Sequence, residues 1–163
     1  MRYILTVVVA LVITSSSFSP RSAEAAYAKA MQNESGIFLA VKCGRGSNKQ
    51  TALINHKTVC LASNPIILPA EFVSITELQS RGDRIWFDLI FSQKAVKTMS
   101  QLAANLPSAN FALVVQKDVF TTFPAQELTA NRTFRFQGSD KDHPSFSEVQ
   151  KRLKALINSS TPQ

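Results

Sequence analysis

The sequence predicts an α+β fold: an antiparallel or mixed sheet with two helices packed on one face, preceded by a disulfide-linked β-hairpin region. Residues 84–91, RIWFDLIF, alternate like a strand that can be covered on both faces. Residues 93–106 instead place apolar side chains three and four positions apart, as a helix does. Cys43 and Cys60, the two cysteines of the chain, both fall in strand-like segments of its first half.

The N-terminus has the layout of a secretory signal peptide over residues 1–25. Arg2 provides a positive start, residues 4–13 are almost entirely apolar, and Ala23-Glu24-Ala25 fits the small-x-small cleavage pattern. The apolar run is shorter than the roughly 20 residues that a spanning helix needs. We therefore expect cleavage after Ala25 and export to the periplasm, with an uncleaved membrane anchor as the alternative. No later segment is apolar enough to cross a bilayer, so the mature form should not span a membrane.

Residues 26–62 predict an N-terminal β region. Residues 37–43 form a strand pattern, a Gly- and Asn-rich turn follows at 44–48, and residues 51–54 and 58–62 flank a hairpin turn at 55–57. An exported chain meets an oxidising compartment, so Cys43 and Cys60 should form a disulfide. Its loop of about 17 residues would contribute about 3 kcal/mol. Two free buried thiols are the alternative, and His56 should be exposed at the hairpin tip.

Residues 63–158 predict the main α+β domain, and its first half runs from an extended connector into a strand and a helix. Pro65 and Pro69 bracket the connector, and residues 79–83 are turn-like. The Arg-Gly-Asp triplet within that turn is best explained as a hairpin connection, because Gly and Asp suit such a turn. Ser92 is a plausible N-cap for the helix over residues 93–106, which Pro107 ends.

The second half of this domain predicts three strands and a closing helix. Residues 110–116 and 119–123 are strand patterns around a tight turn at 117–118, and residues 133–136 form a further short strand. A polar loop is expected over residues 140–144. Ser145 and Glu148 have the spacing of a capping box for a helix that runs to about residue 158, which leaves 159–163 as a flexible tail.

The composition does not favour catalysis or metal binding. Two His and two Cys leave little material for a zinc or iron–sulfur site, so no metal and no cofactor is expected. Both histidines lie in predicted loops, and no Gly-x-Ser-x-Gly or phosphate-binding glycine loop is present. Asp88, inside an apolar strand, should either pair with an arginine or face solvent. We therefore expect a protein that is not an enzyme.

The net charge of +7 allows an anionic partner. An exported protein rarely meets nucleic acid, so no nucleic-acid partner is expected. An acidic protein is the anionic partner that remains as an alternative. The densest basic cluster is Lys151, Arg152 and Lys154, which is interpreted mainly as a solvated helix face.

From about Leu61 to Leu156 the chain resembles the head of the first periplasmic domain of SecD, the accessory subunit of the bacterial protein-export channel. The resemblance lies in the order of a Pro-containing extended segment, a strand, an amphipathic helix, an apolar hairpin, a short strand ending near Gly138 and a closing helix. The matching segments are residues 64–68, 85–89, 95–106, 111–123, 134–138 and 146–156. The resemblance implies a periplasmic binding head and does not name its ligand.

The chain departs from that family at three places. The family hairpin turns on Asp-Gly, whereas this chain has Gln116-Lys117-Asp118. The family's Gly-rich approach to the last strand is replaced by residues 128–132. SecD also has membrane helices that couple proton flow to export, and no such segment follows the leader here, so the chain is not a complete export motor.

Three functions are compatible with these features. The first is an exported, soluble, non-enzymatic protein-binding module similar to the SecD head, with a role in export. The second is an immunity or inhibitor protein that neutralises a toxin delivered to the periplasm, and the third, much less favoured, is a small hydrolase. Because binding residues concentrate on surface loops, the expected partner-binding residues are Lys117, Asp118, Asp140, Asp142, His143, Lys151, Arg152 and Lys154.

Overall fold

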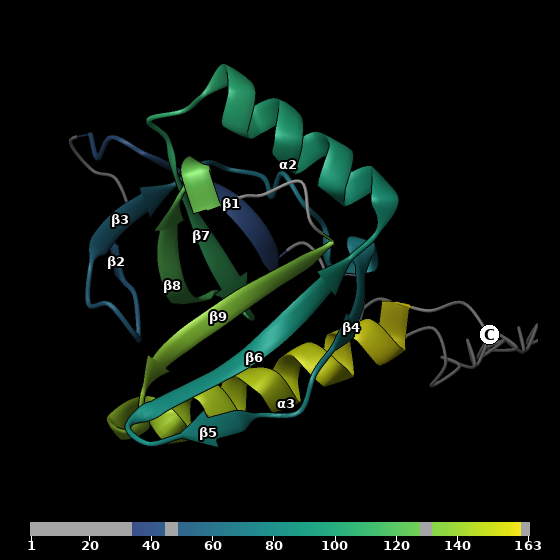
Figure 1. Ribbon diagram of the computed structural model, residues 1–163. Helices are drawn as coiled ribbons and strands as arrows, with labels where there is room; N and C mark the ends of the chain where they lie inside the picture. Colours follow the sequence, from purple (N-terminus) through teal and green to yellow (C-terminus); the bar gives the residue numbers. More distant parts are fainter. Residues whose placement is uncertain (1–33, 45–48, 128–131, 161–163) are drawn as a thin grey trace, which may run out of the picture.

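The computed structural model describes residues 34–44, 49–127 and 132–160 (Figure 1). The predicted signal peptide and most of the turn at 44–48 lie outside these residues. In chain order the elements are β1 (Gly36–Val41), β2 (Gln50–Thr51), β3 (Thr58–Leu61), η1 (Pro69–Glu71), β4 (Phe72–Ile75), β5 (Gln79–Arg81), β6 (Arg84–Phe91), α2 (Gln93–Asn105), β7 (Asn110–Val115), β8 (Asp118–Pro124), η2 (Ala125–Glu127), β9 (Thr133–Ser139), η3 (Asp140–Asp142) and α3 (His143–Ser160).

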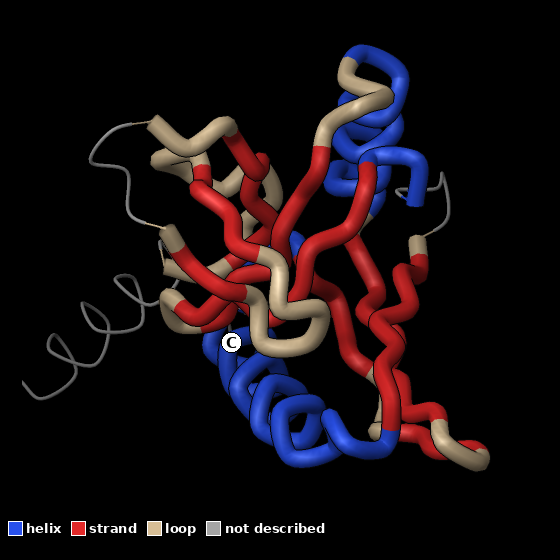
Figure 2. The backbone as a smooth tube through the Cα atoms, turned by 90° about the vertical axis from the view of Figure 1, so that its left-hand side faces the viewer, coloured by secondary structure: helices blue, strands red, loops and turns tan. Residues whose placement is uncertain are grey.

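The α+β prediction is confirmed, and the strands divide into two antiparallel sheets rather than one. The five-stranded sheet has the order β2-β3-β1-β7-β8. The four-stranded sheet is centred on β6, with β4 and β5 along one side and β9 along the other. Figure 2 shows α2 at the top and α3 at the bottom, with the strands between them. The first-half strands are integral to the fold, because β1 pairs with β7 over five residue pairs.

The five-stranded sheet curls until its two edges meet. The turn between β2 and β3 lies along β8, where Leu53 donates its N–H to Val119 O at 3.0 Å. Asn55 donates its side-chain amide to both Thr122 O and Thr122 Oγ1, each at 2.8 Å. The sheet is therefore nearly a closed barrel. The strand expected over residues 51–54 is shorter than predicted, because the chain beyond Thr51 turns to bond with β8 instead of β3.

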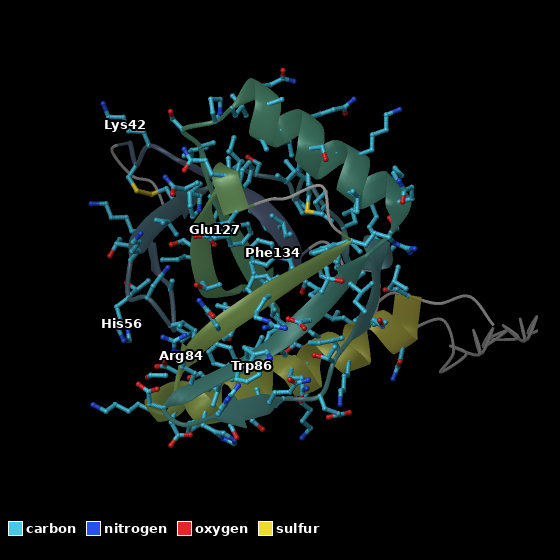
Figure 3. The ribbon with its side chains drawn as sticks, viewed as in Figure 1. Lys42, His56, Arg84, Trp86, Glu127 and Phe134 are labelled. Carbon is cyan, nitrogen blue, oxygen red and sulfur yellow. A yellow bond between two sulfur atoms is a disulfide. The ribbon has the colours of Figure 1, made fainter. Side chains whose placement is uncertain are left out.

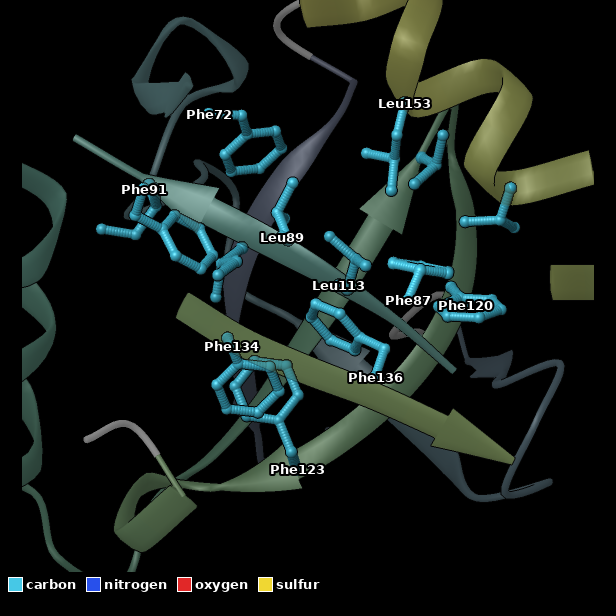
Figure 4. Packing of buried hydrophobic residues seen from close by; sticks show 14 of the residues in the cluster. Phe72, Phe87, Leu89, Phe91, Leu113, Phe120, Phe123, Phe134, Phe136 and Leu153 are labelled. Carbon is cyan, nitrogen blue, oxygen red and sulfur yellow. The ribbon is translucent and has the colours of Figure 1, made fainter. Parts of the chain in front are cut away.

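A cluster of phenylalanine rings fills the space between the two sheets and α3 (Figure 4). Phe87 on β6 stacks on Phe120 on β8 with ring centroids 5.8 Å apart. Phe146 on α3 packs edge-on against Phe120 at 5.0 Å, and Phe123 on β8 meets Phe134 on β9 at 4.8 Å. Each such ring contributes roughly 1.5–3 kcal/mol by leaving water. The sheets are therefore held together by side chains, without backbone pairing between β8 and β9.

The helix predicted between the two strands of the second half is confirmed as α2. Ser92 Oγ accepts the N–H of Ala95 at 3.1 Å, so Ser92 is the N-cap. The helix ends at Asn105, two residues before Pro107. Its inward stripe buries Ala95, Val96 and Met99 in the main core.

The turn expected over residues 79–83 is shorter in the structure. Gln79–Arg81 forms β5, which pairs with the start of β6, so only the tip of the segment turns. Gly82 has φ +63° at that tip, a left-handed conformation that glycine adopts without steric cost. The hairpin interpretation of the Arg-Gly-Asp triplet is thereby confirmed. The tight turn expected at 117–118 lies one residue earlier: Gln116 and Lys117, both with positive φ, form it, and Asp118 already pairs with Val115 as the first residue of β8.

The start of α3 differs from its prediction. Ser139, and not Ser145, forms the capping box: its Oγ and N–H both bond to Asp142 Oδ2 at 2.9 Å. Residues 140–142 are therefore a 3-10 turn, and α3 begins at His143 instead of after a loop. Pro144 is compatible with this start because the first-turn N–H of a helix has no partner within it. The helix ends at Ser160, two residues into the predicted tail.

The predicted disulfide between Cys43 and Cys60 is present, with the two Cα atoms 5.3 Å apart. Within the described ranges, no helix is both long and apolar enough to cross a membrane.

Candidate functional site

Two of the predicted binding residues lie at the β7–β8 hairpin tip, and each is held by an internal ion pair. Lys117 Nζ lies 2.7 Å from Glu34 Oε1. Asp118 Oδ2 lies 2.9 Å from Arg152 Nη1, while Arg152 Nε also bonds to Glu148 Oε1 at 2.9 Å. Arg152 donates hydrogen bonds to Glu148 and Asp118, and these bonds raise the pKa of Arg152 above its ordinary value, the bond to Glu148 having the larger effect. The fold thus brings Asp118 and Arg152 together, but they bind each other.

The other predicted residues do not form a common surface. Lys154 Nζ pairs with Glu77 Oε1 at 2.6 Å, and Asp142 caps the start of α3. Asp140, His143 and Lys151 are exposed, the first two at one end of α3 and the third at its middle. The basic helix face predicted at 151–154 is therefore partly neutralised by acidic residues from β8 and the β4–β5 connection.

One backbone edge of the four-stranded sheet lies along β9, and the other runs along β4 and β5. Phe91 donates its N–H to Arg132 O at 2.8 Å, and this bond shows which residue pairs of β6 and β9 are hydrogen-bonded and which are not. In an antiparallel pair hydrogen-bonded positions alternate, so Phe134 and Phe136 bond to β6 through their backbone. The backbone N–H and C=O groups of Arg135 and Gln137 therefore point away from β6. No described residue bonds to them.

A cleft of about 290 Å³ lies beside this edge, between β9 and β8. Its base is phenylalanine, its rim is polar, and Figure 3 shows Glu127 and Phe134 at one end of it. The residues that line it are Ile54, Asn55, Phe120, Thr121, Thr122, Phe123, Glu127, Phe134, Arg135, Phe136, Gln137 and Phe146. The β2–β3 turn covers the β8 side, since Asn55 bonds to Thr122 O there. On the facing edge of β8, Asn55 occupies Thr122 O, whereas no described residue bonds to the outward backbone groups of Arg135 and Gln137 on β9.

The outer surface of the same sheet is not covered by either helix, and it faces the viewer in Figure 1 with α3 behind it. Asp88 accepts two hydrogen bonds from Arg135, at 2.8 and 2.9 Å, as the arginine-pairing alternative predicts. Hydrogen bonding to Asp88 is the larger cause of a raised pKa of Arg135, and charge attraction to Asp88 is the smaller one. The guanidinium lies 5.5 Å from the centre of the Trp86 ring, within cation–π range. Arg135 thus stands fixed at the margin of the cleft.

Across the described ranges, no group of three or more His, Cys, Asp or Glu side chains is placed to hold a metal ion. His56 is exposed at the β2–β3 turn with φ +53°, where the hairpin prediction places it.

The β9 edge was not among the predicted site residues. The sequence predicts a strand only over residues 133–136, and the alternation of Phe134, Arg135, Phe136 and Gln137 was the signal available to extend it. Which side of that strand stays unpaired depends on β6, some 50 residues earlier in the chain, and local sequence does not encode it.

Comparison of the chain with protein-family models, with curated proteins and with solved structures finds no match. The resemblance to the SecD head therefore stays a prediction from the order of the elements.

Proposed function

We propose that this protein is an exported, non-enzymatic protein-binding module that takes an extended segment of its partner as an additional strand on β9. The observation that most supports this is the outward-pointing backbone of Arg135 and Gln137 beside a phenylalanine-floored cleft. A strand added to a sheet edge gains affinity from main-chain hydrogen bonds, and pockets for alternate side chains give specificity.

The cleft suits a partner segment in which apolar residues alternate with polar ones. Side chains on the inner face of an added strand would approach Phe134 and Phe136, while those on the outer face would lie beside Arg135 and Gln137. This mode recognises unfolded or extended chains in general, which is compatible with the proposed role in export. An immunity protein would instead present a rigid surface to one folded toxin.

Amide hydrogen exchange, followed by NMR, tests the proposal at single residues. The probe is reduced, carboxymethylated lysozyme, a permanently unfolded chain. Binding should slow exchange of the Arg135 and Gln137 amides, because a new strand would accept their hydrogens. The Phe134 and Phe136 amides, already bonded to β6, should change little. Binding of the probe without protection of Arg135 and Gln137 would contradict the β9 site.

A proline substitution provides a matched pair of variants. Gln137→Pro removes one outward N–H while leaving the β6 ladder intact, since proline is tolerated at sheet edges. Gln137→Ala removes the same side chain and keeps the N–H. Only the proline variant should lose affinity for the unfolded probe. Equal affinities of the two variants would show that the β9 backbone does not take part.

A further inference from the structure

The open end of the five-stranded barrel forms a second groove, of about 550 Å³, on the other side of β8 from the cleft. Its lining comes from the end of β1, the start of β3 and the adjoining ends of β7 and β8. These residues are Ala40, Val41, Lys42, Cys43, Lys57, Thr58, Val59, Asn110 and Thr122. Barrel mouths are one of the places where ligand sites recur in proteins. We call this groove the barrel mouth.

The barrel mouth is cationic without internal compensation. No Asp or Glu occurs between Glu34 and Glu71, a segment that includes Lys42 and Lys57. Within the described part of the chain, neither of these ammonium groups lies within ion-pair distance of a carboxylate. Both side chains are exposed, and Figure 3 shows Lys42 at the outer margin beside the disulfide.

Three lysines elsewhere on the surface differ in this respect. Lys94, Lys117 and Lys154 each lie within 2.6–2.7 Å of a glutamate oxygen. The positive charge of the barrel mouth is therefore available to a bound molecule, whereas the charge of these three lysines is neutralised by a glutamate of the chain.

The mouth also has an apolar centre and a fixed rim. Val41, the last residue of β1, is 40% exposed, and Val59 faces the same groove. The bond between Cys43 and Cys60 links the segment after β1 to β3, so the stretches that bear Lys42 and Lys57 are covalently held together. A bound molecule thus meets charges whose backbone positions are already set, which lowers the entropic cost of binding.

We infer that the barrel mouth binds an acidic peptide segment of a partner protein, with carboxylates on Lys42 and Lys57 and an apolar side chain between them on Val41 and Val59. The exposed side-chain amide of Asn110 forms no hydrogen bond with a described residue and can bond to the peptide backbone. The lining contains no aromatic residue on which a base could stack, and this favours a peptide over a single-stranded nucleic acid. The inference is independent of the β9 site.

The test uses a fluorescein-labelled decapeptide of alternating glutamate and valine, with a glutamine–valine peptide as its neutral control. Fluorescence anisotropy should show binding of the acidic peptide that weakens as salt rises. The double variant Lys42→Gln/Lys57→Gln should lose affinity about ten-fold, because two exposed charge contacts are removed. The matched double variant Lys97→Gln/Lys151→Gln changes net charge equally at exposed lysines that have no ion pair, and it should bind within about two-fold of the wild type.

Three results would overturn the inference. The first is an equal loss of affinity in the two double variants, which would mean that only net charge matters. The second is equal binding of the neutral peptide, and the third is tighter binding of a ten-nucleotide thymidine strand. Thermal melting of each variant confirms that it is folded, and Gln137→Pro, which affects only β9, should leave binding of the acidic peptide unchanged.

Discussion

Asp88 on β6 and Arg135 on β9 are register partners in the antiparallel pair, and two hydrogen bonds of 2.8 and 2.9 Å join the carboxylate to the guanidinium. Their side chains stand on the outer face of the sheet, while the Arg135 backbone points along the sheet toward the cleft. The pair therefore fixes the strand that provides the free edge without occupying that edge. A binding strand that is well positioned before its partner arrives loses less entropy on binding.

Removing this pair should be visible in the fluorescence of Trp86, the single tryptophan of the chain. Arg135→Ala removes the cation 5.5 Å from the ring centre and should shift the Trp86 emission. The denaturation midpoint should fall slightly with an unchanged denaturant slope, because exposed ion pairs add little stability. Lys97→Ala, which removes an exposed cation from α2, is the control. An unaltered spectrum in Arg135→Ala would show that the contact does not persist in solution.

Two glycines with positive φ should respond differently to substitution. Gly36, with φ +137°, lies where the backbone of β1 approaches the segment 65–67, and a Cβ there would collide with Ile67 O. Gly36→Ala should therefore destabilise the fold by about 2 kcal/mol or more in urea unfolding. Gly82, at the open β5–β6 turn, has free space around it, and Gly82→Asn should cost under about 1 kcal/mol. Equal losses would contradict the crowding at Gly36.

Signals that act over a few residues were enough to predict several elements. The polar Ser92 and the breaker Pro107 delimit α2, and the apolar run of β6 identifies the central strand of its sheet. The disulfide followed from an export signal together with two cysteines in adjacent strand patterns. The residues that determine α2 and β6 lie close together in sequence. For the disulfide, two cysteines allow only one pairing within the chain.

The features that the sequence did not predict depend on contacts between distant residues or on degenerate patterns. Ser139–Asp142 and Ser145–Glu148 both satisfy the capping-box spacing, and which of them starts the helix depends on where β9 ends. Asn55 closes the barrel on Thr122, which is 67 positions away. The ion pairs of the predicted binding residues depend on distant residues for the same reason. Lys154 finds Glu77 across 77 positions, and no local pattern reveals such a partner.

The disulfide should contribute measurably to stability. The double variant Cys43→Ser/Cys60→Ser should lose about 3 kcal/mol in denaturant unfolding, because the crosslink closes a loop with a sequence separation of 17. Dithiothreitol should lower the midpoint of the wild-type protein toward that of the variant and leave the variant itself unchanged. If the reduced and oxidised wild-type proteins unfold at the same midpoint, the crosslink does not constrain the unfolded chain as the loop-closure argument requires.

Closure of the barrel depends on Asn55, and its removal should loosen the wall that separates the cleft from the barrel mouth. Asn55→Ala removes two hydrogen bonds of 2.8 Å to Thr122, a buried residue on β8. The expected loss is about 1–3 kcal/mol, because Thr122 would be left with unsatisfied polar atoms. Exchange of the Leu53 amide, which bonds to Val119 O, should quicken more than exchange within α2, because the turn would separate from β8 locally. Asn158→Ala, an exposed change on α3, is the control. Unchanged exchange at Leu53 would mean that the backbone bonds to β8 hold the turn without the Asn55 side chain. Faster exchange there would show that this one side chain keeps the edge of β8 covered.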